Sequence, residues 1–407
     1  MRLLVVGHPF IVAYHQKKYA AMKQLDPRLE LRIVGPKVYR HPFRVFSPEV
    51  HAGLNPEEVV PLSFALYRTH MTYLLNPVRM AALLRDFRPD VIHAEEEPHA
   101  FITVETLSLR GMFAPQAVVS LFTWDNLDRP RSFPVRALKH GLRAYSLRRA
   151  AAVVCGNREA EQLLRARTGY AGITAVLPQY GLDPSDHLPG HEPALRQQLG
   201  LADAVSVGYV GRLVPEKGIE LLLDALAQLT QHPWKLLLLG SGPLERAIRE
   251  QWMPRFPGRI VHVPAVPHGE VPCYLRCLDI FVLASYAAPN WKEQFGLALV
   301  QAMMTGLACI GSSSGAIPEV LGPGGLIFAE RDSRSLAEAL KCLLASPDRR
   351  SELSGKAREF ALRNYTSQRL AARYLLFFEE VRRAAVMRKD RQTSRAENVQ
   401  SILGRGA

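Results

Sequence analysis

The sequence predicts an α/β protein in which two Rossmann-like domains, each built on a parallel sheet, face each other across a cleft. Three observations support this. Short apolar runs typical of buried strands alternate with helical patterns along most of the chain. The alternation occurs in two series, separated by a proline-rich stretch from Pro184 to Pro193. A chain of 407 residues is also too long for one ordinary core.

The composition of the chain limits the classes of partner and the cellular compartment that are expected for it. The chain carries a formal charge of +13, which is typical of proteins that meet nucleic acid, an anionic membrane surface or anionic substrates, and also of merely soluble ones. A nucleic-acid binder needs a basic stripe with interleaved aromatic residues, which the sequence lacks, so no nucleic-acid partner is expected. The five cysteines are odd in number with apolar neighbours, which favours a reducing cytoplasm. Neither a signal peptide nor a membrane span is predicted.

Residues 1–184 are predicted to form the N-terminal domain. Buried strands are expected at 2–7, 31–34, 89–94, 117–122, 151–155 and 173–177. Helices are expected near 15–25, at 80–87 and at 131–149, whereas four prolines make 40–63 irregular. Because parallel strands end at one edge of a sheet, polar residues that follow them are expected to face a ligand.

Polar residues follow three of these strands. His8 comes after the first strand, Glu95–Glu97 and His99 come after the third, and Thr123 and Asp125 come after the fourth. Three adjacent carboxylates are unusual at a strand end. A solvated turn and one wall of a substrate site both explain them, and the residues alone leave the two interpretations open.

The predicted helix from Arg131 to Arg149 is strongly basic. Its cations alternate with apolar residues such as Leu138, Leu142 and Leu147. Such a helix can lie on an anionic bilayer, or it can be a surface helix that packs by its apolar face. The second interpretation is the simpler one, and the first makes peripheral attachment to the inner face of a membrane a candidate property of a cytoplasmic protein.

Residues 185–365 restart the alternation and are predicted to form the second domain. Strands are expected at 205–210, 235–239, 260–263, 280–284, 308–310 and 326–328, and helices are expected at 219–229 and from 297 onward. A further helix at 366–384 carries one apolar stripe, and residues 385–407 are expected to form a polar, fraying tail.

Two turns of the second domain carry the strongest chemical signals. The turn from Gly211 to Gly218 contains Arg212, a planar fork of donors, and Lys217, a compact charge; together they suit a diphosphate without needing a metal. Glu293 lies on a strand-to-helix loop, where Phe295-Gly296-Leu297 opens a helix whose free N–H groups suit phosphate or sugar oxygens. Spacing alone favours the simpler interpretation of the first turn, a tight turn with two solvated cations.

These motifs resemble retaining glycosyltransferase family 4, whose members have the GT-B fold. The resemblance lies in Glu293-x-Phe-Gly296, in Gly211-Arg-Leu-x-x-Glu-Lys-Gly218, in Gly240-Ser-Gly242-Pro and in the turn around Gly315. It implies an enzyme that moves a sugar from a UDP- or GDP-sugar to a hydroxyl of a glycan, lipid-linked or small-molecule acceptor, with no metal or other cofactor. It also implies that helix 366–384 returns to the N-terminal, acceptor-binding domain.

The resemblance assigns roles residue by residue. Arg212 and Lys217 would stabilise the leaving diphosphate, and Glu293 would orient the sugar or stabilise its positive charge. The implied donor-binding positions are Gly211, Gly240, Gly242, Phe295, Gly296, Leu297, Gln301 and Gly315.

The chain departs from the family pattern at three places. Gln301 stands where the family has a second acidic residue, so contact with the ribose is expected to weaken. Thr123 stands where members often have histidine, and only Gly7 remains of a glycine-rich loop. The acceptor-side candidates are therefore His8, His93, His99, Thr123 and Asp125.

Other classes of protein fit the sequence less well. A nicotinamide dehydrogenase would need a Gly-x-Gly-x-x-Gly turn with an acidic residue about 20 positions later, and no strand is followed by one. A phosphorylase would need a lysine for pyridoxal phosphate, and no such pattern occurs. A catalytically weak sugar-nucleotide-binding protein of the same fold stays open because of Gln301.

Overall fold

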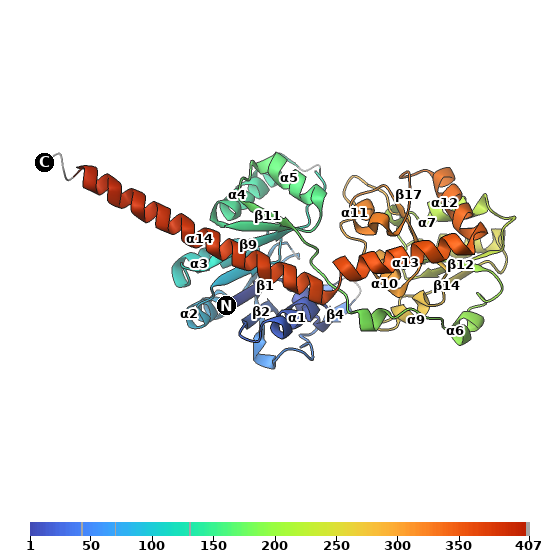
Figure 1. The fold of residues 1–407 in the computed structure, drawn as a ribbon, viewed down its shortest axis with the longest axis horizontal. Coiled ribbons are helices and arrows are strands. Elements are labelled where there is room, and N and C mark those ends of the chain that lie inside the picture. The colour runs from blue at the N-terminus through green and yellow to red at the C-terminus, as the bar shows by residue number, and fades with distance from the viewer. Residues whose placement is uncertain (42–43, 70, 130–131, 404–407) are drawn as a thin grey trace.

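The structure is a computed structural model that describes residues 1–41, 44–69, 71–129 and 132–403. It contains two α/β domains, each around its own parallel sheet, joined by a linker and by the final helix (Figure 1). The N-terminal sheet has seven strands in the order β11-β10-β9-β8-β1-β2-β5. They are β1 (Arg2–Val6), β2 (Glu30–Pro36), β5 (Val59–Leu62), β8 (Val91–Ala94), β9 (Val118–Thr123), β10 (Ala152–Cys155) and β11 (Ile173–Val176).

The strand order of this sheet indicates where along its edge a ligand-binding crevice lies. From β1 the chain adds β2 and β5 on one side, and later adds β8, β9, β10 and β11 on the other. The order therefore reverses between β1 and β8, where open parallel sheets leave a crevice beyond their carboxyl ends. His8 follows β1 and Glu95–Glu97 follow β8, so these residues lie at that crevice.

The second sheet has six parallel strands in the order β14-β13-β12-β15-β16-β17. They are β12 (Val205–Val210), β13 (Trp234–Leu239), β14 (Ile260–Val263), β15 (Ile280–Leu283), β16 (Ala308–Ser312) and β17 (Gly325–Phe328). Here the order reverses between β12 and β15. The turn that contains Arg212 follows β12 and the loop that contains Glu293 follows β15, so both chemical signals share one crevice.

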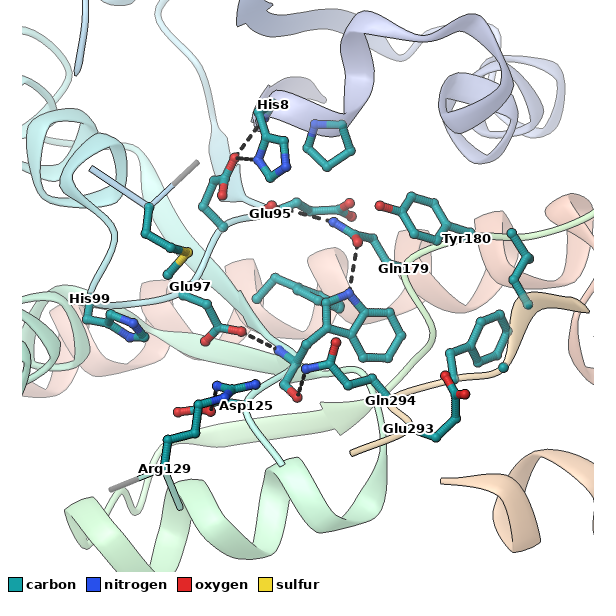
Figure 2. Close-up of a pocket in the computed structure, with 18 of the residues that line it drawn as sticks. His8, Glu95, Glu97, His99, Asp125, Arg129, Gln179, Tyr180, Glu293 and Gln294 are labelled. Carbon is teal, nitrogen blue, oxygen red and sulfur yellow. Dashed lines mark hydrogen bonds and ion pairs between the residues drawn. The ribbon is translucent and has the colours of Figure 1, made fainter. Parts of the chain in front are cut away.

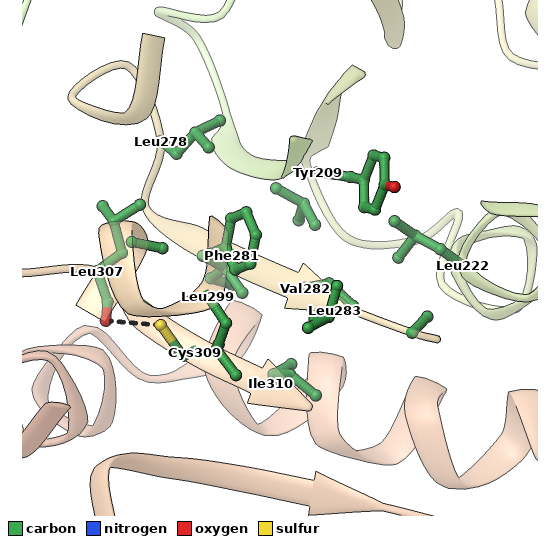
Figure 3. Packing of buried hydrophobic residues seen from close by; sticks show 14 of the residues in the cluster. Tyr209, Leu222, Leu278, Phe281, Val282, Leu283, Leu299, Leu307, Cys309 and Ile310 are labelled. Atoms are coloured by element: carbon green, nitrogen blue, oxygen red, sulfur yellow. Dashed lines mark hydrogen bonds between the residues drawn. The ribbon is translucent and has the colours of Figure 1, made fainter. Parts of the chain in front are cut away.

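Continuous apolar runs explain why these strands are central. Phe281, Val282 and Leu283 of β15 are buried, as a strand covered by helices on both faces requires. Figure 3 shows these residues packed with Leu299 of the following helix and with Ile310 of β16. The resulting core anchors both ends of the loop that carries Glu293.

Helices cover both sheets. In the N-terminal domain they are α1 (Lys17–Leu25), α2 (Pro77–Phe87), α3 (Phe101–Phe113), α4 (Phe133–Arg149) and α5 (Arg158–Thr168). In the second they are α6 (Pro193–Gln198), α7 (Ile219–Ala227), α8 (Glu245–Ala247), α9 (Val271–Leu275), α10 (Leu297–Thr305), α11 (Ile317–Leu321), α12 (Ser333–Ala345) and α13 (Pro347–Asn364). None of the helices in the described ranges is long and apolar enough to cross a membrane.

The last helix, α14 (Ser367–Leu403), crosses back to the N-terminal domain (Figure 1). Tyr374, Phe377 and Phe378 join the same core as Leu3 and Val5 of β1. The helix then continues to Leu403, where a fraying tail from 385 is expected from the sequence. Residues 385–403 contain neither proline nor glycine, so nothing in them ends a helix that packing has already started.

The stretch 40–63 is more regular than its prolines predict. It contributes β5 to the main sheet, and two antiparallel pairs lie in and after it: β3 (Tyr39–His41) with β4 (Arg44–Phe46), and β6 (Phe64–Tyr67) with β7 (Tyr73–Leu75). Pro61 is tolerated because β5 is an edge strand, where one side of the backbone needs no partner in the sheet.

Candidate active site

The loop between β15 and α10 holds Glu293 in a defined position. Its side chain is only 9% exposed, and Oε2 accepts hydrogen bonds from Lys217 Nζ at 2.6 Å and Ser285 Oγ at 3.0 Å. Gly315 makes the neighbouring turn possible, because its φ is +56° and a Cβ there would lie 2.4 Å from the carbonyl oxygen of Glu293. The carboxylate is therefore fixed by one cation, one hydroxyl and a close backbone contact.

Lys217 reaches Glu293 from the other turn of the crevice. It ends a short 3-10 helix, Pro215–Lys217, and its Nζ also lies 4.6 Å from the centre of the Trp291 ring. Gly218 follows with φ +71°, and a Cβ there would lie 2.0 Å from the carbonyl oxygen of Ala284. Only glycine allows this approach, so the turn after β12 and the end of β15 touch directly.

Two more glycines hold the neighbouring turn close. A Cβ on Gly240 would lie 1.9 Å from the carbonyl oxygen of Gly211, and one on Gly242 would lie 2.4 Å from that of Leu213. The three predicted glycines Gly211, Gly240 and Gly242 thus belong to one backbone contact. Arg212 lies on the same turn with its side chain exposed, and it forms no ion pair among the described residues.

The start of α10 presents backbone donors to the crevice. Gly296, with φ +76°, caps the helix, and Leu297 is its first residue. The Phe295 ring points elsewhere: it packs 6.1 Å from the Trp124 ring and 5.7 Å from the Tyr365 ring, measured between centroids. Phe295 therefore contributes backbone to the site, while its side chain fills the junction between the domains.

Gln301 lies further along α10 and is nearly buried. Its Nε2 lies 3.5 Å from the hydroxyl of Tyr14, which belongs to the N-terminal domain. The Tyr14 ring stacks on His268, with centroids 5.5 Å apart and planes 11° apart. The residue that departs from the family pattern thus contacts the opposite domain.

Both domains line one cavity of about 710 Å³. Figure 2 shows Glu293 and Gln294 at one side of it and residues of the N-terminal domain around the rest. The N-terminal wall includes His8, Glu95, Glu96, Glu97, His99, Asp125, Arg129, Lys139, Gln179 and Tyr180. The carboxylates at 95–97 therefore form a wall of the cavity, and the interpretation as a solvated turn is wrong.

Each of the three carboxylates has its own partners. Glu96 Oε1 accepts from the His8 backbone at 2.7 Å and from the Tyr73 hydroxyl at 2.9 Å, and lies 2.5 Å from His8 Nδ1. Glu95 pairs with the buried Lys18. Burial raises the pKa of Glu95, but the charge of Lys18 and the hydrogen bond from His93 outweigh it and lower that pKa to about 2.

The pKa of Glu97 is shifted in the opposite direction to that of Glu95. Its carboxylate accepts from Thr123 Oγ1 at 2.7 Å and from the Trp124 backbone at 2.8 Å. Burial, followed by the charge of nearby Asp125, raises the pKa of Glu97 to about 7. Asp125 itself contacts three guanidinium groups, Arg129 at 3.0 Å, Arg143 at 3.3 Å and Arg167 at 3.0 Å.

The five residues predicted as acceptor-side candidates lie in different places in the structure. His8, His99 and Asp125 line the cavity. Thr123 is not among the lining residues and instead orients Glu97. His93 is buried in β8, bonded to Ser120 and Glu95 and packed against α14, so its candidate role at the acceptor site is wrong. Side-chain alternation along β8 directs it to the core.

No sequence pattern predicts the residues that join the two domains at the loop of Glu293. Asn126 Nδ2 donates to the carbonyl oxygen of Glu293 at 3.0 Å, and Asn157 Nδ2 donates to that of Gln294 at 2.8 Å. Gln294 Nε2 in turn donates to the carbonyl oxygen of Trp124 at 3.0 Å. These residues are distant in sequence, so only the approach of the domains reveals that the N-terminal domain positions the loop.

Several known proteins resemble this chain. A 2-deoxystreptamine glucosyltransferase of Streptomyces kanamyceticus is 26% identical over 50% of this chain and 54% of its own length. An MMP alpha-(1->4)-mannosyltransferase of Mycolicibacterium hassiacum is 26% identical over 88% of this chain and 87% of its own. The chain spans only about half the length of several curated relatives, the first of these two included.

Solved structures and family comparisons agree with the fold. The crystal structure of Anabaena Alr3699/HepE in complex with UDP superposes with a TM-score of 0.70 at 17% identity, over 93% of this chain and 100% of that one. Residues 11–179 match the family described as glycosyl transferase 4-like domain, and residues 192–360 match glycosyl transferases group 1. With both domains matched in order and both sheets arranged as in GT-B structures, the chain belongs to the group 1 glycosyltransferases of family 4.

Proposed function

We propose that this protein is a retaining glycosyltransferase that moves a sugar from a UDP- or GDP-sugar to an acceptor hydroxyl. The observation that carries the proposal is the contact between Lys217 and Glu293 at one end of a cavity that both domains line. Lys217, Glu293 and the start of α10 meet there. The lysine suits a diphosphate, and the carboxylate suits the positive charge of a reacting sugar. The free N–H groups at the start of α10 suit sugar or phosphate oxygens.

The chemistry follows from where charge develops. As the glycosidic bond to the diphosphate breaks, negative charge grows on the leaving group, and Arg212 and Lys217 stabilise it. Positive charge grows on the sugar, and Glu293 lies where it can stabilise that charge or hold a sugar hydroxyl. The acceptor hydroxyl enters from the N-terminal wall, on the same face as the leaving group, which gives retention of configuration.

Thermal-shift measurements with UDP-, GDP- and ADP-sugars test the proposal first. One donor is expected to raise the melting temperature, and the matching nucleoside monophosphate serves as a control that lacks the second phosphate. Turnover with that donor is expected to persist in EDTA, because the two cations Arg212 and Lys217 act on the diphosphate. Loss of turnover in EDTA that magnesium or manganese restores would contradict the absence of a metal requirement, and no shift with any donor would contradict the proposal.

A second candidate function is binding of a sugar nucleotide without efficient catalysis. The observation that favours it is Gln301, a neutral side chain where the family carries an acid. Charged hydrogen bonds contribute about 1.5–3 kcal/mol and neutral ones about 0.5–1.5 kcal/mol. Turnover in the wild-type protein decides between the two candidates.

Gln301→Glu is expected to tighten nucleotide binding a few-fold, or by roughly 1 kcal/mol, because a carboxylate accepts the ribose hydroxyls more strongly. Turnover should change little, since ribose contacts are equal in the ground and transition states. Calorimetry with UDP or GDP and steady-state kinetics measure the two effects. Transfer that appears only in the variant would instead show that the natural protein is a binder.

We also propose that the protein attaches peripherally to anionic membranes through α4, in the cytoplasm and at the inner face. Phe133 is 72% exposed and Leu138 is 55% exposed on this helix, which contains no acidic residue. Exposed apolar side chains among cations suit a lipid surface of negative charge.

Sedimentation with vesicles tests the attachment. Anionic vesicles are expected to bind the protein and about 0.5 M salt to release it, because salt screens the cations of α4. Phe133→Ser should weaken binding. Leu376→Ser, which changes a similarly exposed apolar residue on α14, should not. Equal partition onto neutral and anionic vesicles would remove the electrostatic argument.

A further inference from the structure

We propose that the acceptor carries a phosphate group, and that this phosphate binds at the end of the cavity formed by His99, Arg129 and Lys139. The proposal rests on the proposed function and adds the chemical class of the acceptor. All three side chains line the same cavity as Glu293 but lie on the N-terminal wall. In Figure 2 His99 and Arg129 lie together on the side opposite Glu293.

His99 supplies the first argument. The side chain is only 6% exposed, yet neither ring nitrogen has a hydrogen-bond partner among the described residues. Burial, and then the charges of Lys139 and Arg143, lower the pKa of His99 to about 3, so the imidazole is neutral at pH 7. Buried polar groups in folded proteins normally have partners. A neutral imidazole that lacks one inside a cavity therefore points to a ligand that supplies it.

Charge supplies the second argument. Arg129 and Lys139 line the cavity, and Arg143 and Arg167 lie close behind them. Asp125 is the carboxylate that contacts three of these cations, and the exposed Asp128 contacts Arg167. Glu97 is the other acid nearby, and its pKa of about 7 leaves it partly protonated. Cations therefore outnumber full negative charges at this end of the cavity, which favours an anionic ligand.

The carboxylates elsewhere in the cavity lining already have partners. Glu293 is held by Lys217, and Glu96 is held by His8 and Tyr73. The Arg129 guanidinium also bridges the two domains by donating to the carbonyl oxygen of Asn290 at 3.0 Å. An acceptor with one charged and one neutral end is thus oriented. Its phosphate lies against His99, Arg129 and Lys139, and a hydroxyl is left toward Glu293. Arg129 and Lys139 supply the charge–charge attraction, and the His99 N–H supplies a directed hydrogen bond.

The test uses the full-length protein saturated with UDP, so that the donor phosphate site is occupied. Glycerol 3-phosphate is titrated against glycerol by calorimetry at constant ionic strength. Glycerol 3-phosphate is expected to bind at least about tenfold more tightly, and His99→Phe and Lys139→Gln are each expected to weaken it about tenfold, the loss of one charge-assisted hydrogen bond. His99→Gln should retain most of the affinity. Lys341→Gln, which changes an exposed cation of α12 outside this cavity, should retain all of it.

A second arm separates a soluble phosphate from a lipid headgroup by using phosphatidylglycerol vesicles. Loss of glycerol 3-phosphate binding in His99→Phe with unchanged vesicle binding would assign a soluble phosphorylated acceptor, and the reverse would assign a lipid. Indifference to His99→Phe in both arms, or an equal loss in Lys341→Gln, would overturn the proposal. UDP affinity is measured separately in every variant. If the wild-type protein fails to bind UDP, the proposed function fails on its own, whatever the phosphate arms show.

Discussion

Glu293→Gln is expected to lower turnover about a hundredfold or more while changing nucleotide-sugar affinity less than about threefold. Glutamine keeps the size of the side chain and can still accept from Lys217 and Ser285, so the loop should hold its shape. What disappears is the negative charge, which acts mainly when the sugar becomes positive. Steady-state kinetics and calorimetry with the donor separate the two effects.

The matched control is Glu338→Gln, the same change at an exposed position of α12 in the same domain. It should leave both turnover and affinity unchanged. If Glu293→Gln also leaves turnover unchanged, Glu293 does not act at the reacting sugar, and the mechanism given above is wrong. A large loss of affinity with turnover intact would instead make Glu293 a binding residue.

Lys217→Ala and Arg212→Ala are each expected to weaken binding of UDP or GDP by about 1.5–3 kcal/mol, which is about ten- to a hundredfold or more. Each removes a charged donor to the diphosphate. The two residues should differ in kinetics. Arg212 is exposed and forms no ion pair among the described residues, whereas Lys217 contacts Glu293 directly. Lys217→Ala therefore also leaves a nearly buried carboxylate whose remaining side-chain donor, among the described residues, is Ser285.

A double-mutant cycle checks this coupling. The effect of Lys217→Ala on turnover should be smaller in the Glu293→Gln background, whereas the effect of Arg212→Ala should be nearly the same in both backgrounds. Lys341→Ala, an exposed lysine on α12, is the control for general loss of charge. Unchanged UDP and GDP affinity in both single variants would contradict the assignment of this turn to the diphosphate.

Local patterns were enough to predict the fold class and the main features of the donor side. Runs such as Ile280–Leu283 predict a buried strand because a strand covered on both faces must be apolar along its whole length. Gly218, Gly296 and Gly315 have positive φ, and the sequence places glycine where no other residue fits. Two separate motifs that resemble family 4 contain Lys217 and Glu293, which are 76 positions apart.

The acceptor side depends on contacts that no local pattern contains. His93 and His99 are six positions apart, yet one packs against α14 and the other lines the cavity. Thr123 has a family counterpart, and only the structure shows that it orients Glu97 instead of lining the cavity. Strand order decides which loops share an edge, and strand order is a property of the whole sheet.

The sequence by itself therefore determined the two parallel sheets and the glycine turns, because these follow from burial and backbone geometry within short segments. Only the tertiary structure decided how the domains meet. It brings Asn126 onto the loop of Glu293, Tyr14 onto Gln301 and Arg129 onto Asn290. Each of these contacts joins residues more than 150 positions apart, and it exists because two independently predictable domains pack in one particular orientation.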